Sequence, residues 1–334
     1  MISRKTVLVL ALCLAAGGCG PFDSLKPERE IASIGESVRL GETAPLERQD
    51  VTVRIDGRPL RVVVWRRGEG SARAVVFVHG MASDHRAWRL VWGHLGDEGV
   101  IALDLPGCGQ SEAPSPDESP RLYTPEALAE AVFAVLEAQG PARRYTLVGH
   151  SLGASILLRG LCDPTLRERF ADVIGRVDAA VLVSCVDVSL PRVPADVRQL
   201  VQLPPAAFSA AAALGQLRQI IARNMRQGFD DPDQPSREEV LRLERSLSDP
   251  ARVRAMQAMA RNSAPNNDWT PDWDAIEKIE ARYEAIQSPC LVVWGARDET
   301  LPVSMGYKLA AQLPEGRLAV IPRCRHSPNI ERPA

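Results

Sequence analysis

The segment from Gly149 to Gly153, with the sequence Gly-His-Ser-Leu-Gly, constrains the fold of this chain more than any other. An apolar run, residues 145–148, precedes it, and a helix-forming run comes directly after it. A strand that turns at once into a helix strains the backbone of the middle residue and leaves no room for side chains beside it, so both flanking positions need glycine. The segment therefore predicts a strand, a sharp turn and a helix, with the Ser151 hydroxyl at the tip of the turn. The amide of Leu152 is expected to point at whatever that serine attacks.

The composition suits a globular enzyme and gives no sign of nucleic-acid binding. Of the 334 residues, 45% are hydrophobic and 25% are charged, which is enough for a sizeable core in one large domain or one domain with an insert. The formal net charge of −2 provides no basic surface for nucleic acid. Because the sequence contains no C-x-x-C pair, no dinucleotide fingerprint and no phosphate-binding loop, it predicts no metal site and no cofactor.

The first 18 residues predict an export signal that is not part of the fold. A basic start precedes an apolar run, residues 7–16, that is too short to span a bilayer. The adjoining Ala-Gly-Gly-Cys, which ends at Cys19, resembles the lipobox of bacterial lipoproteins, although leucine is usual where Ala16 stands. The resemblance implies cleavage before Cys19 and a lipid anchor to the membrane on that cysteine. With Gly20 next, it implies an outer-membrane lipoprotein facing the periplasm; the alternative is an ordinary secretory signal.

Beyond the signal, the sequence predicts a polar tether, residues 19–49, and then an α/β core. Runs rich in Val, Ile and Leu alternate with helical stretches, which is typical of a mostly parallel sheet covered by helices on both faces. A hairpin is expected over residues 51–65, around Asp56-Gly57. Further strands are expected over residues 74–78, 99–103, 145–148, 179–184, 291–294 and 318–321, and helices over residues 87–95, 125–139 and 152–161.

Residues 189–288 interrupt this alternation. They contain no convincing strand, and helical runs are expected over residues 207–226, 237–248 and 250–262. Because a sheet strand comes immediately afterwards, we expect a helical lid inserted between late strands, over the carboxyl end of the sheet and Ser151. The alternative is a second, unrelated helical domain. The core is accordingly expected in two parts, residues 50–188 and 289–334.

Several motifs occur in the order found in the α/β-hydrolase superfamily, and the chain resembles a lid-bearing serine member of it from about residue 51 to residue 333. The turn His79-Gly80-Met81 resembles the one that supplies the second amide of the oxyanion hole, here that of Met81, beside Leu152. Residues 104–111 resemble the D-x-P-G-x-G-x-S loop of the family. In this resemblance His79, Gly80, Gly149, His150 and Gly153 support the motifs and do not react.

The resemblance implies the catalytic order Ser151, Asp298, His326. Asp298 ends the sequence Trp-Gly-Ala-Arg-Asp, which resembles the turn that carries the acid; Asp187, after an earlier strand, is the alternative. Among the other histidines, two belong to motifs, and His85 and His94 are expected at the surface or in packing. The chemistry needs these residue types because a serine hydroxyl reacts only when an imidazole takes its proton, and the aspartate fixes the imidazole tautomer.

Two departures from the family concern His326. The chain ends eight residues after it (334 − 326 = 8), where relatives continue into a helix that braces the histidine loop. Arg325 stands where a glycine commonly precedes the histidine. If the chain is complete, we expect His326 to be held loosely, and misplacement of a base is costly.

The resemblance implies a serine hydrolase without a cofactor. Its expected partner is a small to medium apolar ester-type substrate: a carboxylic ester, a thioester or a lactone. Serine at the elbow excludes the dehalogenases and epoxide hydrolases of the superfamily, which use aspartate there. Two alternatives remain open: a carbon–carbon bond hydrolase of the ring-cleavage-product type, which residues 224–239 resemble weakly, and a non-catalytic ligand-binding lipoprotein on the same fold.

Overall fold

The computed structural model describes Asp23, Leu25 and residues 45–96, 98–140, 143–186, 201–263 and 273–333. The predicted signal peptide, Cys19, most of the predicted tether and Asp187 lie outside the described residues. Among the helices of the described ranges, none is both long enough and apolar enough to cross a membrane.

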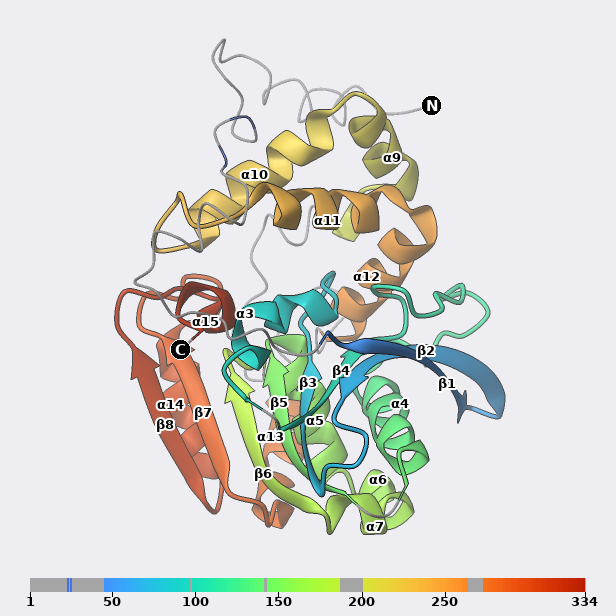
Figure 1. Ribbon diagram of the computed structural model, residues 1–334, viewed down its shortest axis with the longest axis vertical. Coiled ribbons are helices and arrows are strands. Elements are labelled where there is room, and N and C mark those ends of the chain that lie inside the picture. The colour runs from blue at the N-terminus through green and yellow to red at the C-terminus, as the bar shows by residue number, and fades with distance from the viewer. Residues whose placement is uncertain are drawn as a thin grey trace.

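An eight-stranded sheet crosses the lower half of the molecule in Figure 1, with the strand order β1-β2-β4-β3-β5-β6-β7-β8. The strands are β1 (Glu47–Ile55), β2 (Arg58–Arg67), β3 (Arg73–Val78), β4 (Gly99–Asp104), β5 (Arg144–His150), β6 (Val177–Val183), β7 (Cys290–Gly295) and β8 (Gly316–Ile321). β2 pairs antiparallel with both β1 and β4, and every other neighbouring pair is parallel. The predicted mostly parallel sheet is therefore confirmed, as is the hairpin, whose Asp56 and Gly57 both have the positive φ that its tight turn requires.

Alternate side chains of the central strands face two different layers. In β3, Val76 packs into the large apolar cluster that includes α4 and α5, whereas Phe77 packs on the opposite face against Trp88. The helices of the core are η1 (His85–Trp88), α3 (Arg89–Trp92), α4 (Pro125–Ala138), α5 (Leu152–Cys162), α6 (Pro164–Arg169), α7 (Ala171–Ile174), α13 (Trp273–Glu280), η2 (Tyr283–Ala285), α14 (Val303–Gln312) and α15 (Pro328–Glu331). Because successive strand side chains point to opposite faces, a sheet covered on both faces needs continuous apolar strands, which is the pattern of this sequence.

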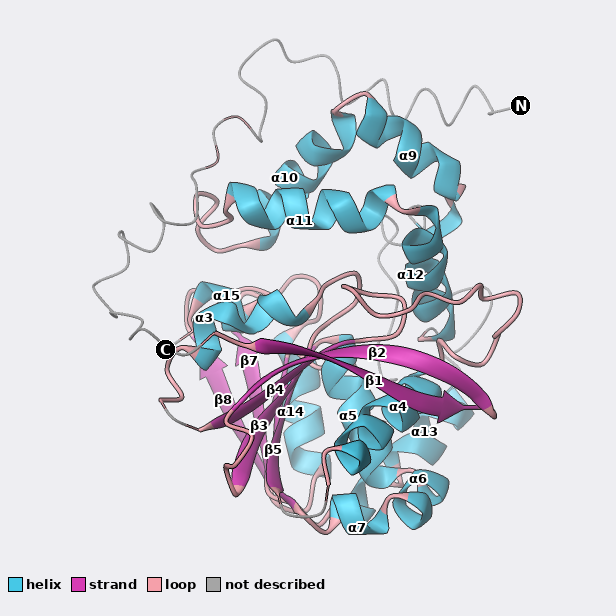
Figure 2. Cartoon of the chain, turned by 45° about the vertical axis from the view of Figure 1, so that its right-hand side comes forward, coloured by secondary structure: helices cyan, strands magenta, loops and turns pink. Residues whose placement is uncertain are grey.

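Four helices between β6 and β7 form a separate layer beyond the carboxyl ends of the strands (Figures 1 and 2). We call them the insertion: α9 (Pro205–Ala213), α10 (Gln216–Gly228), α11 (Arg237–Ser248) and α12 (Pro250–Asn262). The single helical run expected over residues 207–226 is interrupted at Gly215, whose φ of 68° lies in the left-handed region and cannot continue an α-helix. α13 and η2, which the predicted lid also included, pack on the core instead, since Glu280 contacts Lys308 and Gln312 of α14.

The insertion has an apolar cluster of its own, and a residue from the start of the chain belongs to it. Leu25 is only 2% exposed and lies among side chains that include Phe208, Ile221 and Val240. Arg237, at the start of α11, donates hydrogen bonds to the backbone carbonyls of Asp23 and Leu25. The segment that precedes the sheet in the sequence thus contributes to the core of the insertion.

Candidate active site

Ser151 occupies the turn between β5 and α5. Its φ of 52° and ψ of −118° are a backbone conformation that residues with a side chain rarely adopt. A Cβ on Gly149 would lie 2.7 Å from the Cα of Ala154, and a Cβ on Gly153 would lie 2.3 Å from the carbonyl oxygen of Val78. Any side chain at these two positions would push the helix away from the strands, so the two glycines keep the sharp turn that presents the serine.

The structure brings Ser151, His326 and Asp298 together from the ends of three different strands. His326 Nε2 lies 3.2 Å from Ser151 Oγ, and His326 Nδ1 lies 2.8 Å from Asp298 Oδ2. The buried Asp298 carboxylate also accepts hydrogen bonds through Oδ1 from the backbone N–H groups of Thr300 and Leu301. Because an ionised carboxylate only accepts, the Nδ1 of His326 carries the hydrogen, and Nε2 is left to accept the proton of the serine hydroxyl.

The loops after β7 and β8 pack backbone to backbone. A Cβ on Gly295 would lie 1.9 Å from the carbonyl oxygen of Arg325, and the N–H of Arg297 donates to the carbonyl of Cys324 at 2.9 Å. His150 Nε2 donates to the carbonyl of His326 at 2.9 Å. His326 is therefore held on its side chain and on its backbone. The expectation of a loose loop was wrong because it rested only on the few residues between the histidine and the chain end, whereas these contacts come from earlier segments.

The two motif histidines near the serine are neutral, and their hydrogen bonds fix the tautomers. Burial, reinforced by the neighbouring His326, lowers the pKa of His150 to about 3. Burial also lowers the pKa of His79, whose Nδ1 donates to the Gly80 carbonyl while Nε2 accepts the N–H of Leu105. Both side chains thus act as neutral connectors between loops.

The predicted oxyanion donors lie on the two segments that meet at Ser151. Leu152 is the first residue of α5, where the first N–H groups of a helix have no acceptor within the helix. A Cβ on Gly80 would lie 3.2 Å from the Cβ of Ser151, so the turn that leads into Met81 packs directly against the elbow. The donor roles of the Met81 and Leu152 amides stay predictions.

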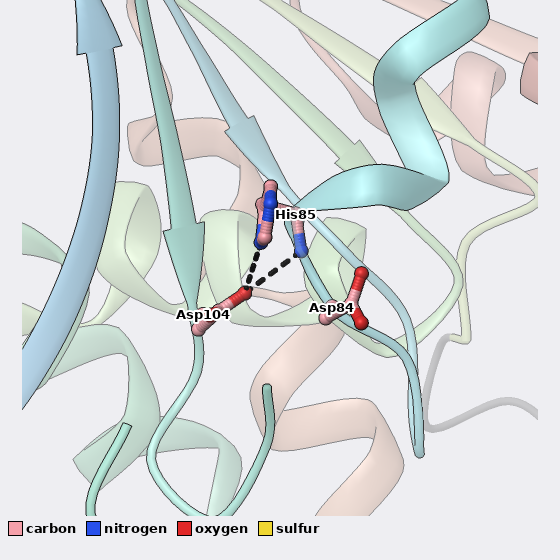
Figure 3. Close-up of side chains that lie close together, drawn as sticks. All are labelled: Asp84, His85 and Asp104. Carbon is pink, nitrogen blue, oxygen red and sulfur yellow. Dashed lines mark hydrogen bonds and ion pairs between the residues drawn. The ribbon is translucent and has the colours of Figure 1, made fainter. Parts of the chain in front are cut away.

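A buried polar cluster lies beside this turn and was not expected from the sequence (Figure 3). Asp104 Oδ1 accepts hydrogen bonds from both the N–H and the Nδ1 of His85, at 2.9 and 2.8 Å, and Oδ2 accepts from the N–H of Gln110. Burial alone would raise the pKa of Asp104, but the hydrogen bonds and charge of His85 outweigh it and hold the pKa at about 2. His85, expected at the surface or in packing, is therefore a buried partner that connects Asp104 to the start of η1.

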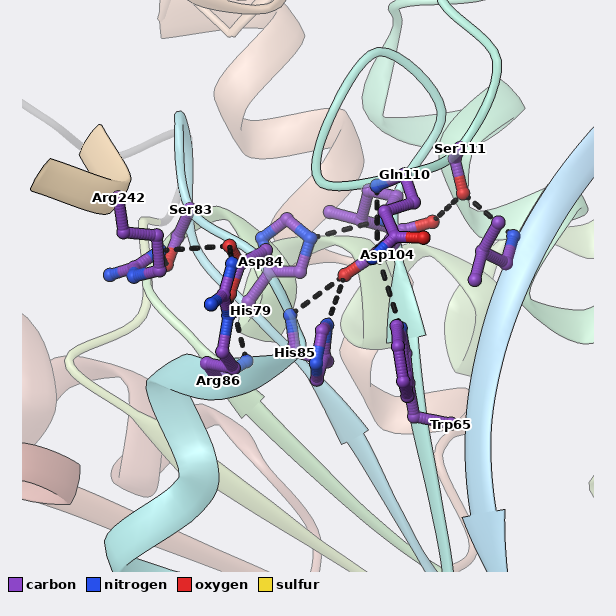
Figure 4. Close-up of polar contacts among 12 residues, drawn as sticks. Trp65, His79, Ser83, Asp84, His85, Arg86, Asp104, Gln110, Ser111 and Arg242 are labelled. Atoms are coloured by element: carbon purple, nitrogen blue, oxygen red, sulfur yellow. Dashed lines mark hydrogen bonds and ion pairs between the residues drawn. The ribbon is translucent and has the colours of Figure 1, made fainter. Parts of the chain in front are cut away.

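The same cluster extends to the insertion through Asp84 (Figure 4). Arg242 of α11 lies 3.4 Å from the Asp84 carboxylate and 3.4 Å from the hydroxyl of Ser83. The ligand atoms of Asp84, His85 and Asp104 lie within 4.8 Å of one another, close enough to surround a cation. These carboxylates already accept hydrogen bonds or ion pairs from backbone, histidine and arginine donors, however, so the cluster fits an internal network better than a metal site.

Neither His85 nor Arg242 could be found from a motif, because their partners are distant in sequence. The nearest signal was the D-x-P-G-x-G-x-S loop itself, which begins at Asp104 and requires some donor for that buried carboxylate.

Comparison with known proteins places this geometry in a family. A sequence model described as the alpha/beta hydrolase family matches residues 75–334. The uncharacterized protein Rv2715 of Mycobacterium tuberculosis is 28% identical over 271 residues, which cover 79% of this chain and 73% of the relative. The uncharacterized hydrolase YugF of Bacillus subtilis is 26% identical over 262 residues, covering 78% and 86% of the two chains.

Solved structures share the fold at lower sequence identity. A thermophilic esterase from Thermogutta terrifontis superimposes with a TM-score of 0.59 and 19% identity, over 85% of this chain and 94% of the esterase. This likeness extends the comparison from the sequence to the arrangement of the sheet and its helices.

Proposed function

The chain belongs to the alpha/beta hydrolase family, and from this premise we propose that it is a serine hydrolase that cleaves small to medium apolar carboxylic esters, thioesters or lactones. One arrangement supports the proposal above all others: the distances of 3.2 Å from Ser151 to His326 and 2.8 Å from His326 to Asp298. Side chains in this relation activate a serine for acyl transfer.

In the acylation step, Ser151 Oγ attacks the carbonyl carbon of the substrate while His326 Nε2 takes the hydroxyl proton. The buried Asp298 carboxylate stabilises the resulting imidazolium through Nδ1. The amides of Met81 and Leu152 are proposed to donate to the oxyanion of the tetrahedral intermediate. When the intermediate collapses, His326 returns the proton to the departing alcohol or thiol, and an ester with Ser151 remains.

Deacylation repeats these steps with water. His326 Nε2 takes a proton from water as the water oxygen attacks the acyl carbon, and it then returns a proton to Ser151 Oγ as the acid product leaves. No redox or metal step is needed for either half of the reaction. For a lactone, the alcohol and the acid remain one molecule after ring opening.

The surroundings of the serine support an apolar substrate and a lid role for the insertion. Met81 and Ala82, which come after the turn that packs against Ser151, are in contact with the apolar cluster of the insertion. We propose that the insertion covers the acyl chain of the substrate and excludes water from the ester bond. Among the described residues, no contact favours cleavage of a carbon–carbon bond. We therefore include that reaction only through one of the substrates in the activity panel below.

We also propose that Cys19 carries a lipid after export and anchors the protein to a membrane, on the strength of its lipobox-like sequence. Growth with labelled palmitate tests this directly, and Cys19→Ser should abolish the label. A wild-type protein that takes up no label and stays soluble would instead have an ordinary secretory signal.

The catalytic proposal is tested by trapping the serine with a fluorophosphonate. We expect modification of Ser151, identified by mass spectrometry, and loss of both labelling and turnover in Ser151→Ala with unchanged thermal unfolding. Ser155→Ala, a buried serine in the first turn of α5, is the matched control and should still be labelled. Turnover that persists in Ser151→Ala contradicts the proposal.

An activity panel then assigns the substrate class. Aryl esters of graded acyl length, thioesters and lactones should be hydrolysed, with a preference among acyl lengths that reflects the insertion. A vinylogous diketone is the probe for carbon–carbon bond cleavage. A protein that binds these compounds but is neither labelled nor active would be a receptor on a hydrolase fold.

A further inference from the structure

The connection between α10 and α11, residues 229–236, lies against the loops that carry Asp298 and His326. Gln234 Nε2 donates to the backbone carbonyls of Ile330 and Glu331 in α15, at 3.0 and 3.1 Å. Just before the connection, the carbonyl of Gln227 accepts a hydrogen bond from Arg325 Nη1 at 2.8 Å. The insertion therefore touches the segments on both sides of His326.

Glu331 joins this connection to the backbone around His326. Its side chain is buried, and Oε1 accepts hydrogen bonds from the N–H groups of Arg325 and Ser327, at 3.0 and 3.3 Å. Its other oxygen, Oε2, accepts the N–H of Asp230 at 2.8 Å. One buried carboxylate thus fixes the residues before and after the histidine and ties them to the insertion.

Asp230 makes the corresponding contact to the loop of the acid. Its carboxylate lies 2.7 Å from Nη1 of Arg297, and its side chain is 7% exposed. Arg297 immediately precedes Asp298, and its own N–H donates to the carbonyl of Cys324 in the histidine loop. The Arg297 side chain is itself 59% exposed, and Arg323 Nε lies 3.8 Å from the other carboxylate oxygen of Asp230. The contact is therefore partly screened by solvent, and its role is to hold the loop of Asp298 against the insertion.

We propose that Glu331 and Asp230 are positioning residues, through which the insertion holds the His326 and Asp298 loops in register with Ser151. The inference rests on the proposed acyl-serine chemistry. Neither side chain is placed at the reacting atoms: Glu331 binds the backbone on both sides of His326, and Asp230 binds the side chain of Arg297, next to Asp298. Since the rate depends on sub-ångström placement of the base, displacement of the residue 229–236 connection should lower the rate of the chemical step and leave substrate affinity almost unchanged.

Two variants test the proposal on the full-length protein with an aryl ester that the assay has shown to be hydrolysed. Glu331→Gln keeps the volume of the side chain but replaces one acceptor oxygen by an NH2 group, so at least one backbone N–H loses its partner. Asp230→Ala removes the charge beside Arg297. For each variant we expect kcat to fall about 10- to 100-fold and KM to change by less than about threefold, the split expected when positioning and not binding is lost. Asp233→Asn, in the same connection but with an exposed side chain, is the control and should match the wild type.

A double-mutant cycle shows whether the contact is the cause. If Asp230 acts through Arg297, the double variant Asp230→Ala, Arg297→Ala should lose about the same factor in kcat as either single variant. That factor should be well below the product of the two single-variant factors, which independent effects would give. Wild-type kcat in both Glu331→Gln and Asp230→Ala, with Ser151→Ala inactive, would overturn the proposal, as would an effect confined to KM. If Glu331→Gln does not fold, Asp230→Ala decides alone. Turnover in Ser151→Ala would instead be a failure of the proposed function.

Discussion

The sheet and the insertion are held in place by different kinds of contact. The sheet is a continuous ladder of backbone hydrogen bonds with buried apolar side chains on both faces. The insertion has a smaller apolar cluster, centred on α9–α11 and the start of α12. It is joined to the core by charged side chains such as Arg242 and Asp230 and by Ala255, Ala258 and Met259 of α12, which pack into the core cluster. Backbone hydrogen bonds do not depend on side-chain identity, whereas ion pairs and small clusters do. The proposed chemistry would therefore be built on the part of the molecule that substitutions disturb least, and the proposed substrate recognition on the part that they can reshape.

The largest expected effect comes from replacing the proposed catalytic acid, which lies at the end of a sheet strand. Asp298→Asn should leave the fold intact but lower kcat by about 10⁴-fold, because an amide no longer selects the imidazole tautomer that the serine needs. Steady-state kinetics with circular dichroism measures both properties. Asp187→Asn, at the alternative position, should have a much smaller effect. If the two variants behave in the reverse way, the acid lies after the earlier strand.

A second measurement compares the two regions directly. Hydrogen exchange should be at least about 100-fold faster in α9, α10 and α11 than in β3 and β5, because local opening requires only the small cluster and the ion pairs to separate. α4 is the internal control, since it is helical like the insertion but packs on the sheet. Equal protection in α10 and α4 would show that the insertion and the sheet open as one unit and would argue against a moving lid.

The smallest expected effect concerns stability at the border of the two regions. The pKa of Asp104 is lowered from 3.8 to about 2, so its ionised form stabilises the fold above about pH 4, and this stabilisation is lost as the pH falls towards 2. The difference corresponds to about 2 kcal/mol of unfolding free energy at neutral pH.

Asp104→Asn should therefore lower the free energy of urea unfolding at pH 7 by about that amount, with a smaller difference from the wild type near pH 2. Asp50→Asn, whose side chain forms an exposed pair with Arg48, is the control and should change stability by less than about 1 kcal/mol. If Asp104→Asn had wild-type stability at pH 7, the stabilisation from the contacts with His85 would only offset the cost of burying the Asp104 carboxylate.

Much of the sheet could be predicted because its signals are local. The six strands expected after the hairpin differ from the observed ones by at most two residues at either end, for example 74–78 against Arg73–Val78, whereas the hairpin begins four residues earlier than expected, at Glu47. The elbow, the hairpin turn and the position of the α9–α12 helices also depend on neighbouring residues. At the elbow and at the hairpin turn, a short pattern has only one physically acceptable backbone.

The contacts between distant segments could not be predicted in this way. The Glu331 carboxylate meets the N–H of Asp230 from 101 positions away, and no periodicity or motif links two such residues. Arg325, an exception to the family pattern in the sequence, contacts Gln227 and Glu299 in the structure. The interruption at Gly215 had a local signal, a glycine within a helical run, but a glycine alone does not reveal whether the helix ends or continues.

Leu25 determines what the smallest intact form of this protein is. The family match begins at residue 75, but a protein trimmed to that point would lose β1, β2 and a side chain buried in the insertion. Arg237 would also lose both carbonyl acceptors. Leu25 is only six positions after Cys19 (25 − 19 = 6). Six residues reach at most about 20 Å even when fully extended. A lipid on Cys19 would therefore keep the insertion, and not the opposite end of the sheet, next to the membrane surface.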